Sequence, residues 1–214
     1  MDSAYMPAIV NSAILALHKG DYVRAKTLAL KALQLVPGQG EAMMALSEAQ
    51  LYLFKNHGKL GGASIYHEHS QIVGLPFIPE IPLCEFSYKG KCVYCAAAKK
   101  NVVFQNAEFA VVRPEFARFE LECWIIPKKH VDSFVDFDKR TAALFMQALQ
   151  ETIRRVKRKT TDYNVAFHAS CKAKKVHFHV EVYPHTATWA GLELGAGVIV
   201  NQMDEKTALK VLRA

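Results

Sequence analysis

Hydrophobic and polar positions follow two different periods along the chain. Residues 142–156 repeat apolar side chains every three to four positions, which predicts an amphipathic helix. Residues 176–183 instead alternate, as in a strand with one buried face. The buried side is predicted to hold Val176, Phe178, Val180 and Val182, and the other side His177, His179, Glu181 and Tyr183. Further strands are expected at 51–55, 102–112 (two, about a turn at 105–106), 121–126 and 163–168, with a short helix at 204–213. This order predicts an α+β domain.

The first fifty residues have a helical texture. Ala25, Ala29 and Ala32 recur at helical spacing, Gly20-Asp21 interrupts the chain before them, and Pro37-Gly38 ends the pattern. We therefore expect a helical hairpin over 1–50, followed by a separate domain over 51–214. The small-residue pattern resembles a single tetratricopeptide-type repeat, and an ordinary hairpin is the alternative. One such unit cannot bury its apolar face alone, so it should dock on the rest of the chain or on a second copy.

The composition restricts the cellular compartment and the ligands that we expect for this chain. Of its residues, 51% are hydrophobic, enough for a substantial core, but no apolar run is long enough to cross a bilayer. The first ten residues lack a basic segment followed by an apolar one, so we expect a cytoplasmic protein with reduced cysteines. The net charge of +7 suits phosphate-bearing ligands. No helix-turn-helix or RNA-binding aromatic pattern is present, so a nucleic-acid partner is not expected.

The segment GGASIYHEHSQ carries the first candidate chemistry. His67 and His69 are two residues apart, and on an extended strand they would point to one side, with Gln71 beside them. The glycine-rich turn at 56–62 precedes them, and its backbone N–H groups could approach phosphate oxygens. A neutral imidazole can attack phosphorus, whereas a glutamine can hydrogen-bond phosphate but cannot act as an acid. This favours transfer of a nucleotidyl group over its hydrolysis.

These residues resemble the signature of galactose-1-phosphate uridylyltransferases, in the histidine triad superfamily. The resemblance implies an antiparallel sheet of the histidine-triad type. It also implies site residues: the nucleophile His69, the phosphate contact Gln71, and a phosphate site lined by Asn56, Gly62 and Ser64. The histidine matching His67 binds zinc in many members. Two features depart from the family: Glu68 replaces the usual proline, and helical residues 1–50 stand where the family has its first histidine-triad half.

A second constellation consists of Cys92, Cys95, His130 and His177. Two thiolates and two imidazoles make a tetrahedral set suited to structural zinc. The pattern also resembles the zinc site in the second half of the same family. A competing metal set, seen in some members, would use His168, His177 and His179 with Glu80. Without such a role, His179 and Glu181 would form a satisfied polar face of the sheet.

Residues 190–198, AGLELGAGV, resemble the C-terminal segment of that family, which contributes to sugar-phosphate binding and to the dimer. The resemblance therefore implies uridylyl transfer between a nucleotide sugar and a sugar phosphate, in a homodimer. Three alternatives stay open. One is an adenine-nucleotide phosphorylase or adenylyltransferase. Another is a non-catalytic, zinc-stabilised module that binds nucleotide or protein, and the third is a subunit that takes its base pocket from another chain.

Overall fold

The computed structural model describes residues 5–35, 51–75, 85, 90–135, 137–169 and 176–214. The predicted helix stop at Pro37-Gly38 and the candidate ligand Glu80 lie outside these residues. Contacts divide the chain into two compact units. One contains residues 1–53, 71–89 and 170–176, and the other contains residues 54–70, 90–169 and 177–214. The predicted boundary at residue 50 stays a prediction.

The N-terminal helices form a hairpin. Helix α1 spans Tyr5–His18 and α2 spans Tyr22–Leu35, joined at Gly20, whose φ of 71° is left-handed. Asp21 caps α2, because its Oδ1 accepts a hydrogen bond from the Arg24 amide at 3.1 Å. The buried contacts of the hairpin are dominated by small residues, which are Ala13, Ala16, Ala25, Ala29 and Ala32. The hairpin confirms helices at the N-terminus, while the tetratricopeptide resemblance stays a prediction.

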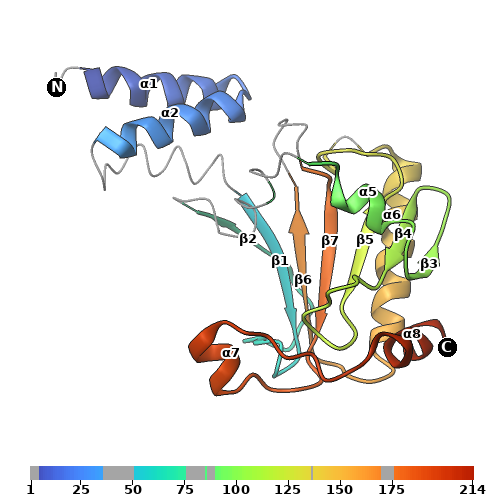
Figure 1. The fold of residues 1–214 in the computed structure, drawn as a ribbon. Coiled ribbons are helices and arrows are strands. Elements are labelled where there is room, and N and C mark those ends of the chain that lie inside the picture. Colours follow the sequence, from blue (N-terminus) through green and yellow to red (C-terminus); the bar gives the residue numbers. More distant parts are fainter. Residues whose placement is uncertain (1–4, 36–50, 76–84, 86–89, 136, 170–175) are drawn as a thin grey trace. The chain divides into compact units, whose positions relative to one another are not determined.

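The described strands form one seven-stranded sheet, in the order β2-β1-β6-β7-β5-β4-β3 (Figure 1). The strands are β1 Leu51–His57, β2 Gln71–Gly74, β3 Val102–Gln105, β4 Phe109–Val112, β5 Cys123–Pro127, β6 Tyr163–His168 and β7 His179–Pro184. The β3-β4, β4-β5, β5-β7 and β6-β7 pairs are all antiparallel. The α+β prediction is confirmed.

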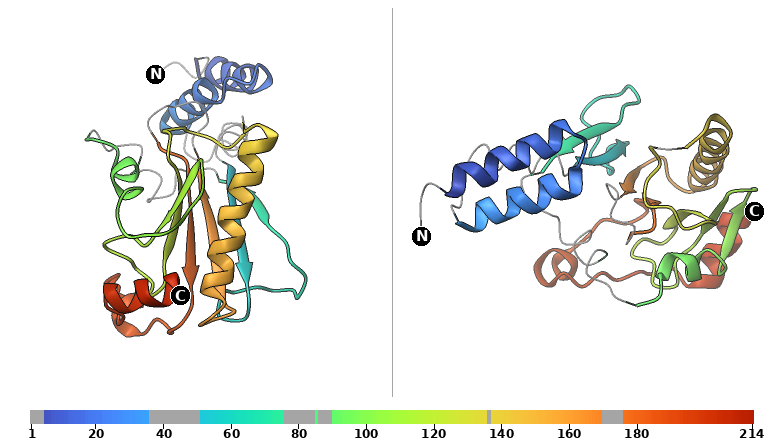
Figure 2. Two further views of the ribbon diagram at one scale, coloured as in Figure 1. Left: turned by 90° about the vertical axis from the view of Figure 1, so that its right-hand side faces the viewer. Right: turned by 90° about the horizontal axis from the view of Figure 1, so that it is seen from above.

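Helix α6, Lys139–Val156, lies along one face of this sheet (Figure 2). It begins at Asp138, whose side chain accepts from the Thr141 amide at 2.7 Å. The predicted apolar stripe forms the contact: Phe145, Ala148 and Val156 are buried in one cluster with Phe178 and other strand residues. Helix α8, Glu205–Arg213, adds Ala208 and Leu212 to the same cluster.

The opposite face of the sheet is polar where β7 crosses it. A short helix, α5 (Val93–Ala97), places Tyr94 against this face, where it packs with Ala110, Val112 and Ile126. The alternation predicted for 176–183 holds, since Phe178, Val180 and Val182 face the core and His179 stacks on Tyr94 at 3.7 Å between ring centroids. All the candidate chemistry of β7 therefore lies on the side away from α6.

Three segments differ from expectation. Neither helix α5 nor helix α7 (Gly191–Ala196) was predicted; α7 ends at Gly197, which has a φ of 67°. His67 and His69 were predicted on an extended strand, but residues 63–70 lie outside the strands, and β2 begins only at Gln71. The reason is local: the turn that begins at Gly58 ends β1, and strand pairing resumes thirteen residues later.

No helix within the described ranges has the length and apolar character that crossing a membrane requires.

Candidate active site and metal centre

The two histidines of the HEH segment lie side by side despite the absence of a strand. Their ring centroids are 5.4 Å apart, and His69 Nδ1 lies 3.0 Å from the backbone carbonyl oxygen of His67. A carbonyl oxygen can only accept, so Nδ1 carries the hydrogen in the neutral ring and Nε2 carries the lone pair. His67 is exposed and His69 half-buried. This is the tautomer that a nucleophile acting through Nε2 requires.

Glu68, which stands in place of the family's proline, turns toward β1. Its carboxylate pairs with Lys55 Nζ, and its Oε1 lies 3.0 Å from His57 Nδ1. The hydrogen bond from Lys55, acting against partial burial, lowers the pKa of Glu68. The His57 ring in turn stacks on Tyr163, with centroids 4.7 Å apart. Glu68 thus connects the histidine segment to β1.

The glycine turn between β1 and this segment is constrained by close backbone approach. A Cβ at Gly61 would lie 2.3 Å from the His57 carbonyl oxygen and 2.9 Å from that of Tyr163, so the position needs glycine. Gly62 has a φ of 72° and open space around it. The amides of residues 60, 62 and 63 donate to Asp162 Oδ1, Lys59 O and Gly58 O. Two of these amides are therefore engaged within the turn and the third by Asp162, which leaves side chains as the more direct phosphate donors.

The remaining predicted phosphate residues occupy separate positions. Asn56 is half-buried near the end of β1, and its Oδ1 accepts from Asn164 Nδ2 at 2.8 Å. Ser64 is exposed after the turn, and Gln71 is the first residue of β2. The assignments of Asn56, Gly62, Ser64, His69 and Gln71 to a phosphate site stay predictions.

The four predicted metal ligands converge. Cys95 Sγ lies 3.4 Å from His130 Nδ1 and 3.3 Å from His177 Nδ1, and Cys92 Sγ lies 3.5 Å from His177 Nδ1. All four ligand atoms fall within 4.8 Å of one another. Ligands about 2.0–2.3 Å from a tetrahedral zinc would be separated by about this much.

Local structure aims these ligands inward. The backbone of α5 brings the two cysteines together, because the Cys95 amide donates to Cys92 Sγ at 3.4 Å. His177 Nε2 contacts the Pro127 carbonyl oxygen at 2.9 Å, which directs Nδ1 toward the thiols in the manner typical of metal-bound histidines. Burial, helped by the neighbouring His130, lowers the pKa of His177 to about 4, so the ring is neutral and able to ligate.

The competing metal set is only partly described. His168 and His179 are buried and stack with centroids 4.5 Å apart, while Glu80 lies outside the described residues. His177 belongs to the cysteine cluster. His168 Nε2 and His179 Nε2 lie 3.5 and 3.6 Å from the carboxylate of Glu181.

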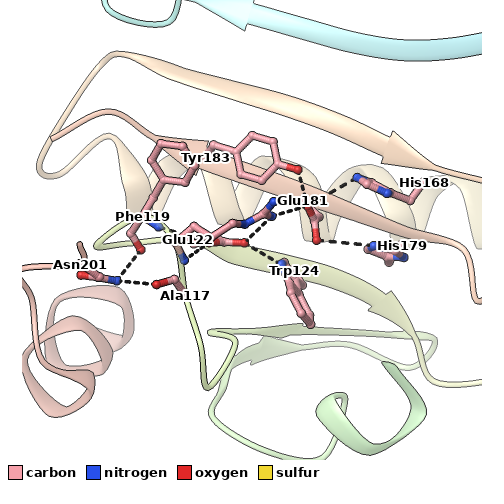
Figure 3. Close-up of polar contacts among 10 residues, drawn as sticks. Ala117, Phe119, Glu122, Trp124, His168, His179, Glu181, Tyr183 and Asn201 are labelled. Carbon is pink, nitrogen blue, oxygen red and sulfur yellow. Dashed lines mark hydrogen bonds and ion pairs between the residues drawn. The ribbon is translucent and has the colours of Figure 1, made fainter. Parts of the chain in front are cut away.

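Two buried carboxylates extend this polar face (Figure 3). Arg118 Nη2 joins them, at 2.9 Å from Glu122 Oε1 and 2.6 Å from Glu181 Oε2. Glu122 also accepts from the Trp124 indole at 2.9 Å, and Glu181 accepts from the Tyr183 hydroxyl. Burial alone would raise the pKa of Glu181, but His179, His168 and Arg118 outweigh it and lower the pKa below its ordinary value.

Comparison with known proteins identifies relatives of this chain. Residues 96–182, which include His130 and His177 of the four converging metal ligands, match the HIT domain. The chain is 29% identical over 179 residues to the ADP-glucose phosphorylase of Arabidopsis thaliana, covering 76% of this chain and 51% of that protein. It is 27% identical over 188 residues to the galactose-1-phosphate uridylyltransferase of Thermotoga maritima, covering 76% and 59%.

Residues 96–182 thus carry a HIT domain. The resemblance to the galactose-1-phosphate uridylyltransferase family is confirmed by these relatives. A solved structure of the Arabidopsis ADP-glucose phosphorylase with bound ADP-glucose superposes with a TM-score of 0.70 at 25% identity, covering 90% of this chain and 66% of that one. The chain spans about half the length of the first of the curated relatives, and less than two thirds of the second.

Sequence reasoning missed several residues that make buried or half-buried polar contacts in this region. Arg118, Glu122, Asn164 and His185 carried no motif. Their contacts join segments up to 108 residues apart, so local spacing contains no signal for them. The alternation that predicted a polar side of β7 was the available clue, because a polar side chain that the core buries needs a partner from another strand.

Proposed function

We propose that this protein is a nucleotidyltransferase that works through a nucleotidyl-histidine on His69. The observation that carries the proposal is the contact of His69 Nδ1 with the His67 carbonyl oxygen, which leaves the Nε2 lone pair for attack. The match to the HIT domain and the named relatives support the same chemistry. The activity of the full-length relatives comes to this shorter chain only as part of the proposal.

The proposed reaction is a double displacement. His69 Nε2 attacks the α-phosphorus of a nucleotide sugar, the bond from that phosphorus to the bridging oxygen breaks, and the sugar 1-phosphate leaves. An oxygen of a second phosphate-bearing acceptor then attacks the same phosphorus, and the imidazole leaves as the neutral base. Splitting one substitution into two lets a single phosphate site serve both steps.

The proposed phosphate site stabilises charge in both steps. Gln71, Asn56 and Ser64 would donate hydrogen bonds to the non-bridging oxygens, and donors already in position are the efficient form of this stabilisation. Gln71 cannot supply a proton as an acid would, which favours transfer to a second phosphate over loss to water.

Two substrates compete as the donor. UDP-glucose follows from the uridylyltransferase relatives, with a hexose 1-phosphate as acceptor. ADP-glucose is favoured by the similarity to ADP-glucose phosphorylase, both in sequence and in the structure with bound ADP-glucose. In that case the acceptor would be inorganic phosphate. The alternative of a non-catalytic binding module rests on the chain spanning only part of its relatives' length.

Intact-protein mass spectrometry tests these proposals directly. The protein is incubated at neutral pH with UDP-glucose or with ADP-glucose, next to His69→Ala and a control, His18→Ala, at the exposed end of α1. We expect an acid-labile adduct of one nucleoside monophosphate on the wild type and on the control, and none on His69→Ala. The donor that gives the adduct identifies the base. If the wild type is folded but forms no adduct with either donor, nucleotidyl transfer is rejected and the non-catalytic binding module is the remaining function.

We also propose that Cys92, Cys95, His130 and His177 hold a structural zinc. Their donor set and convergence fit the ion, and zinc there would cross-link α5 to the strands around β7. Metal analysis of purified protein should give about one zinc per chain, and Cys95→Ser should lose it. The control Cys123→Ala, in the core and outside the cluster, should keep it. Retention of zinc by Cys95→Ser would contradict the assignment.

A cytoplasmic homodimer completes the proposal. A reducing compartment would keep Cys92 and Cys95 available as thiolates. The segment after Trp189 exposes several apolar side chains, which are Leu192, Leu194, Val198 and Val200, between 51% and 74% exposed. Large exposed apolar residues close in sequence are typical of interaction surfaces. Leu194→Glu should therefore shift the protein from dimer to monomer in light scattering, and a wild type that is already monomeric at micromolar concentration would reject the dimer.

A further inference from the structure

The side-chain amide of Asn164 occupies a junction between three segments. Its Nδ2 lies 2.7 Å from the Gly61 carbonyl oxygen and 2.8 Å from Asn56 Oδ1, and its Oδ1 contacts His185 Nε2. Asn164 lies on β6, Asn56 on β1, and His185 directly after β7. The three side chains are half-buried. In such surroundings a hydrogen bond with two donors or two acceptors facing each other is costly.

The direction of each hydrogen bond follows from chemistry. The Gly61 carbonyl can only accept, so the Asn164 atom facing it must be nitrogen, and both hydrogens of that nitrogen are then used. The Asn164 oxygen consequently faces His185, whose Nε2 must carry a hydrogen. The atom of Asn56 that meets Asn164 must be its oxygen. The two hydrogens of Asn56 Nδ2 are therefore directed away from Asn164.

His185 is held so that it can keep this role. Its amide donates to the Asp162 carbonyl at 2.8 Å, its own carbonyl accepts from Thr160 Oγ1 at 2.9 Å, and the Phe119 ring meets it edge-on at 5.4 Å. Burial lowers the pKa of His185 despite the opposing charge of Asp162, so the ring is neutral at neutral pH with its hydrogen on Nε2.

We propose that Asn164 and His185 are positioning residues that fix the Asn56 amide with its NH₂ group presented to the phosphate of the substrate. This inference rests on the proposed function, in which Asn56 binds phosphate. Without the fixed direction, the Asn56 amide could rotate by 180° and present its oxygen, an acceptor, to an anion. We call the hydrogen bonds from His185 to Asn164 and from Asn164 to Asn56 the relay. The relay favours an anionic phosphate ligand at Asn56, whereas a freely rotating amide would accept hydrogen-bond donors and acceptors alike.

Asn164→Asp reverses the relay with almost no change in shape. The introduced carboxylate only accepts, so Asn56 should turn its nitrogen inward and its oxygen toward the phosphate. We expect the rate of adduct formation to fall at least about 100-fold, the usual effect of losing one charge-stabilising donor. His185→Phe should give a smaller loss, about tenfold, and His185→Gln, which restores a donor, should recover most of the rate.

The matched control is Asn201→Asp. Asn201 Nδ2 also donates to two carbonyl oxygens, those of Ala117 at 2.9 Å and Phe119 at 3.2 Å, so the substitution imposes a similar loss on the fold. It does not touch Asn56. If Asn201→Asp and Asn164→Asp slow the adduct equally at equal thermal stability, the effect is structural and the inference is wrong.

A direct readout separates this inference from the proposed function. In protein with ¹⁵N-labelled asparagine, the side-chain NH₂ signal of Asn56 should shift on adding the nucleotide sugar in the wild type. In Asn164→Asp it should move before any ligand is added and no longer respond. An unchanged Asn56 signal in folded Asn164→Asp would overturn the inference even if the adduct forms. If the ligand-free shift occurs but wild type forms no adduct with either nucleotide sugar, the proposed function fails and the relay stands.

Discussion

Replacing Arg118 with methionine tests how far the buried carboxylates depend on its guanidinium. Arg118 Nη2 contacts Glu122 at 2.9 Å and Glu181 at 2.6 Å, and the two carboxylate side chains are 0% and 3% exposed. Removing one partner of a buried ion pair costs about 3–5 kcal/mol, because a charge is left uncompensated. Glu122 keeps two backbone amides and the Trp124 indole as donors. We therefore expect the lower end of that range, about 3 kcal/mol.

Urea unfolding followed by tryptophan fluorescence measures this loss. The chain has two tryptophans, Trp124 and Trp189, and both lie in the unit that contains most of the sheet, so the signal follows that unit. With a slope of about 2 kcal/mol per molar urea, a loss of about 3 kcal/mol lowers the midpoint by about 1.5 M. The control Lys100→Met removes an exposed pair with Glu115 and should cost less than about 1 kcal/mol.

The pH dependence checks the mechanism. Glu181 has a pKa lowered below its ordinary value, so its ionised form adds stability above the unfolded pKa of about 4.3, and that stability is lost as the pH falls through the folded pKa. Removing Arg118 takes away part of this contribution. The gap between wild type and Arg118→Met should thus be full at pH 7 and narrow progressively below about pH 4. A midpoint shift at pH 7 no larger than that of Lys100→Met would refute the reasoning.

Three further outcomes follow from packing and burial. Phe178→Ala should lower the free energy of unfolding by about 3–5 kcal/mol, since the ring is 0% exposed at the centre of the core; a urea midpoint near that of wild type would contradict this. Gly61→Ala should cost about 2 kcal/mol by forcing two carbonyl oxygens away, while Gly62→Ala, with open space but a φ of 72°, should cost about 1 kcal/mol; thermal melts that reverse this order would be inconsistent with the turn. Burial raises the pKa of the Cys123 thiol to about 12, so site-resolved mass spectrometry should find it resistant to iodoacetamide at pH 8 until the protein unfolds.

Sequence reasoning succeeded where a local period reports on a buried face. The stripe over 142–156 predicted α6, and the alternation over 176–183 predicted which side of β7 enters the core. Cys92, Cys95, His130 and His177 also lie together, as expected from the Cys-x-x-Cys pair and the family resemblance, while their role as zinc ligands stays a prediction. The periodicity can be read from a few neighbouring residues, and the ligand set can be recognised because cysteine and histidine are infrequent residue types.

The parts that sequence reasoning missed depend on long-range pairing. Arg118 finds Glu181 across 63 residues, and Asn164 finds Asn56 across 108. Arginine and asparagine are common residue types, so the sequence alone does not indicate which other residue each of them contacts. The extended strand expected at His67 was wrong for a related reason: two histidines spaced by two suggest a strand, but strand formation needs a neighbouring backbone to pair with.

The register of β6 against β7 connects the core to the candidate chemistry. It pairs His168 with His179, Ala166 with Glu181, and Asn164 with Tyr183, so these residues share the face away from α6. A slip of one residue would turn every one of them into the core and expose the apolar set, at a cost far above the stability of a domain. The apolar side chains that are buried against α6 therefore also determine which face of the sheet the polar side chains occupy. It follows that the orientation of Asn56, through Asn164, is set by the same hydrophobic packing that holds the sheet.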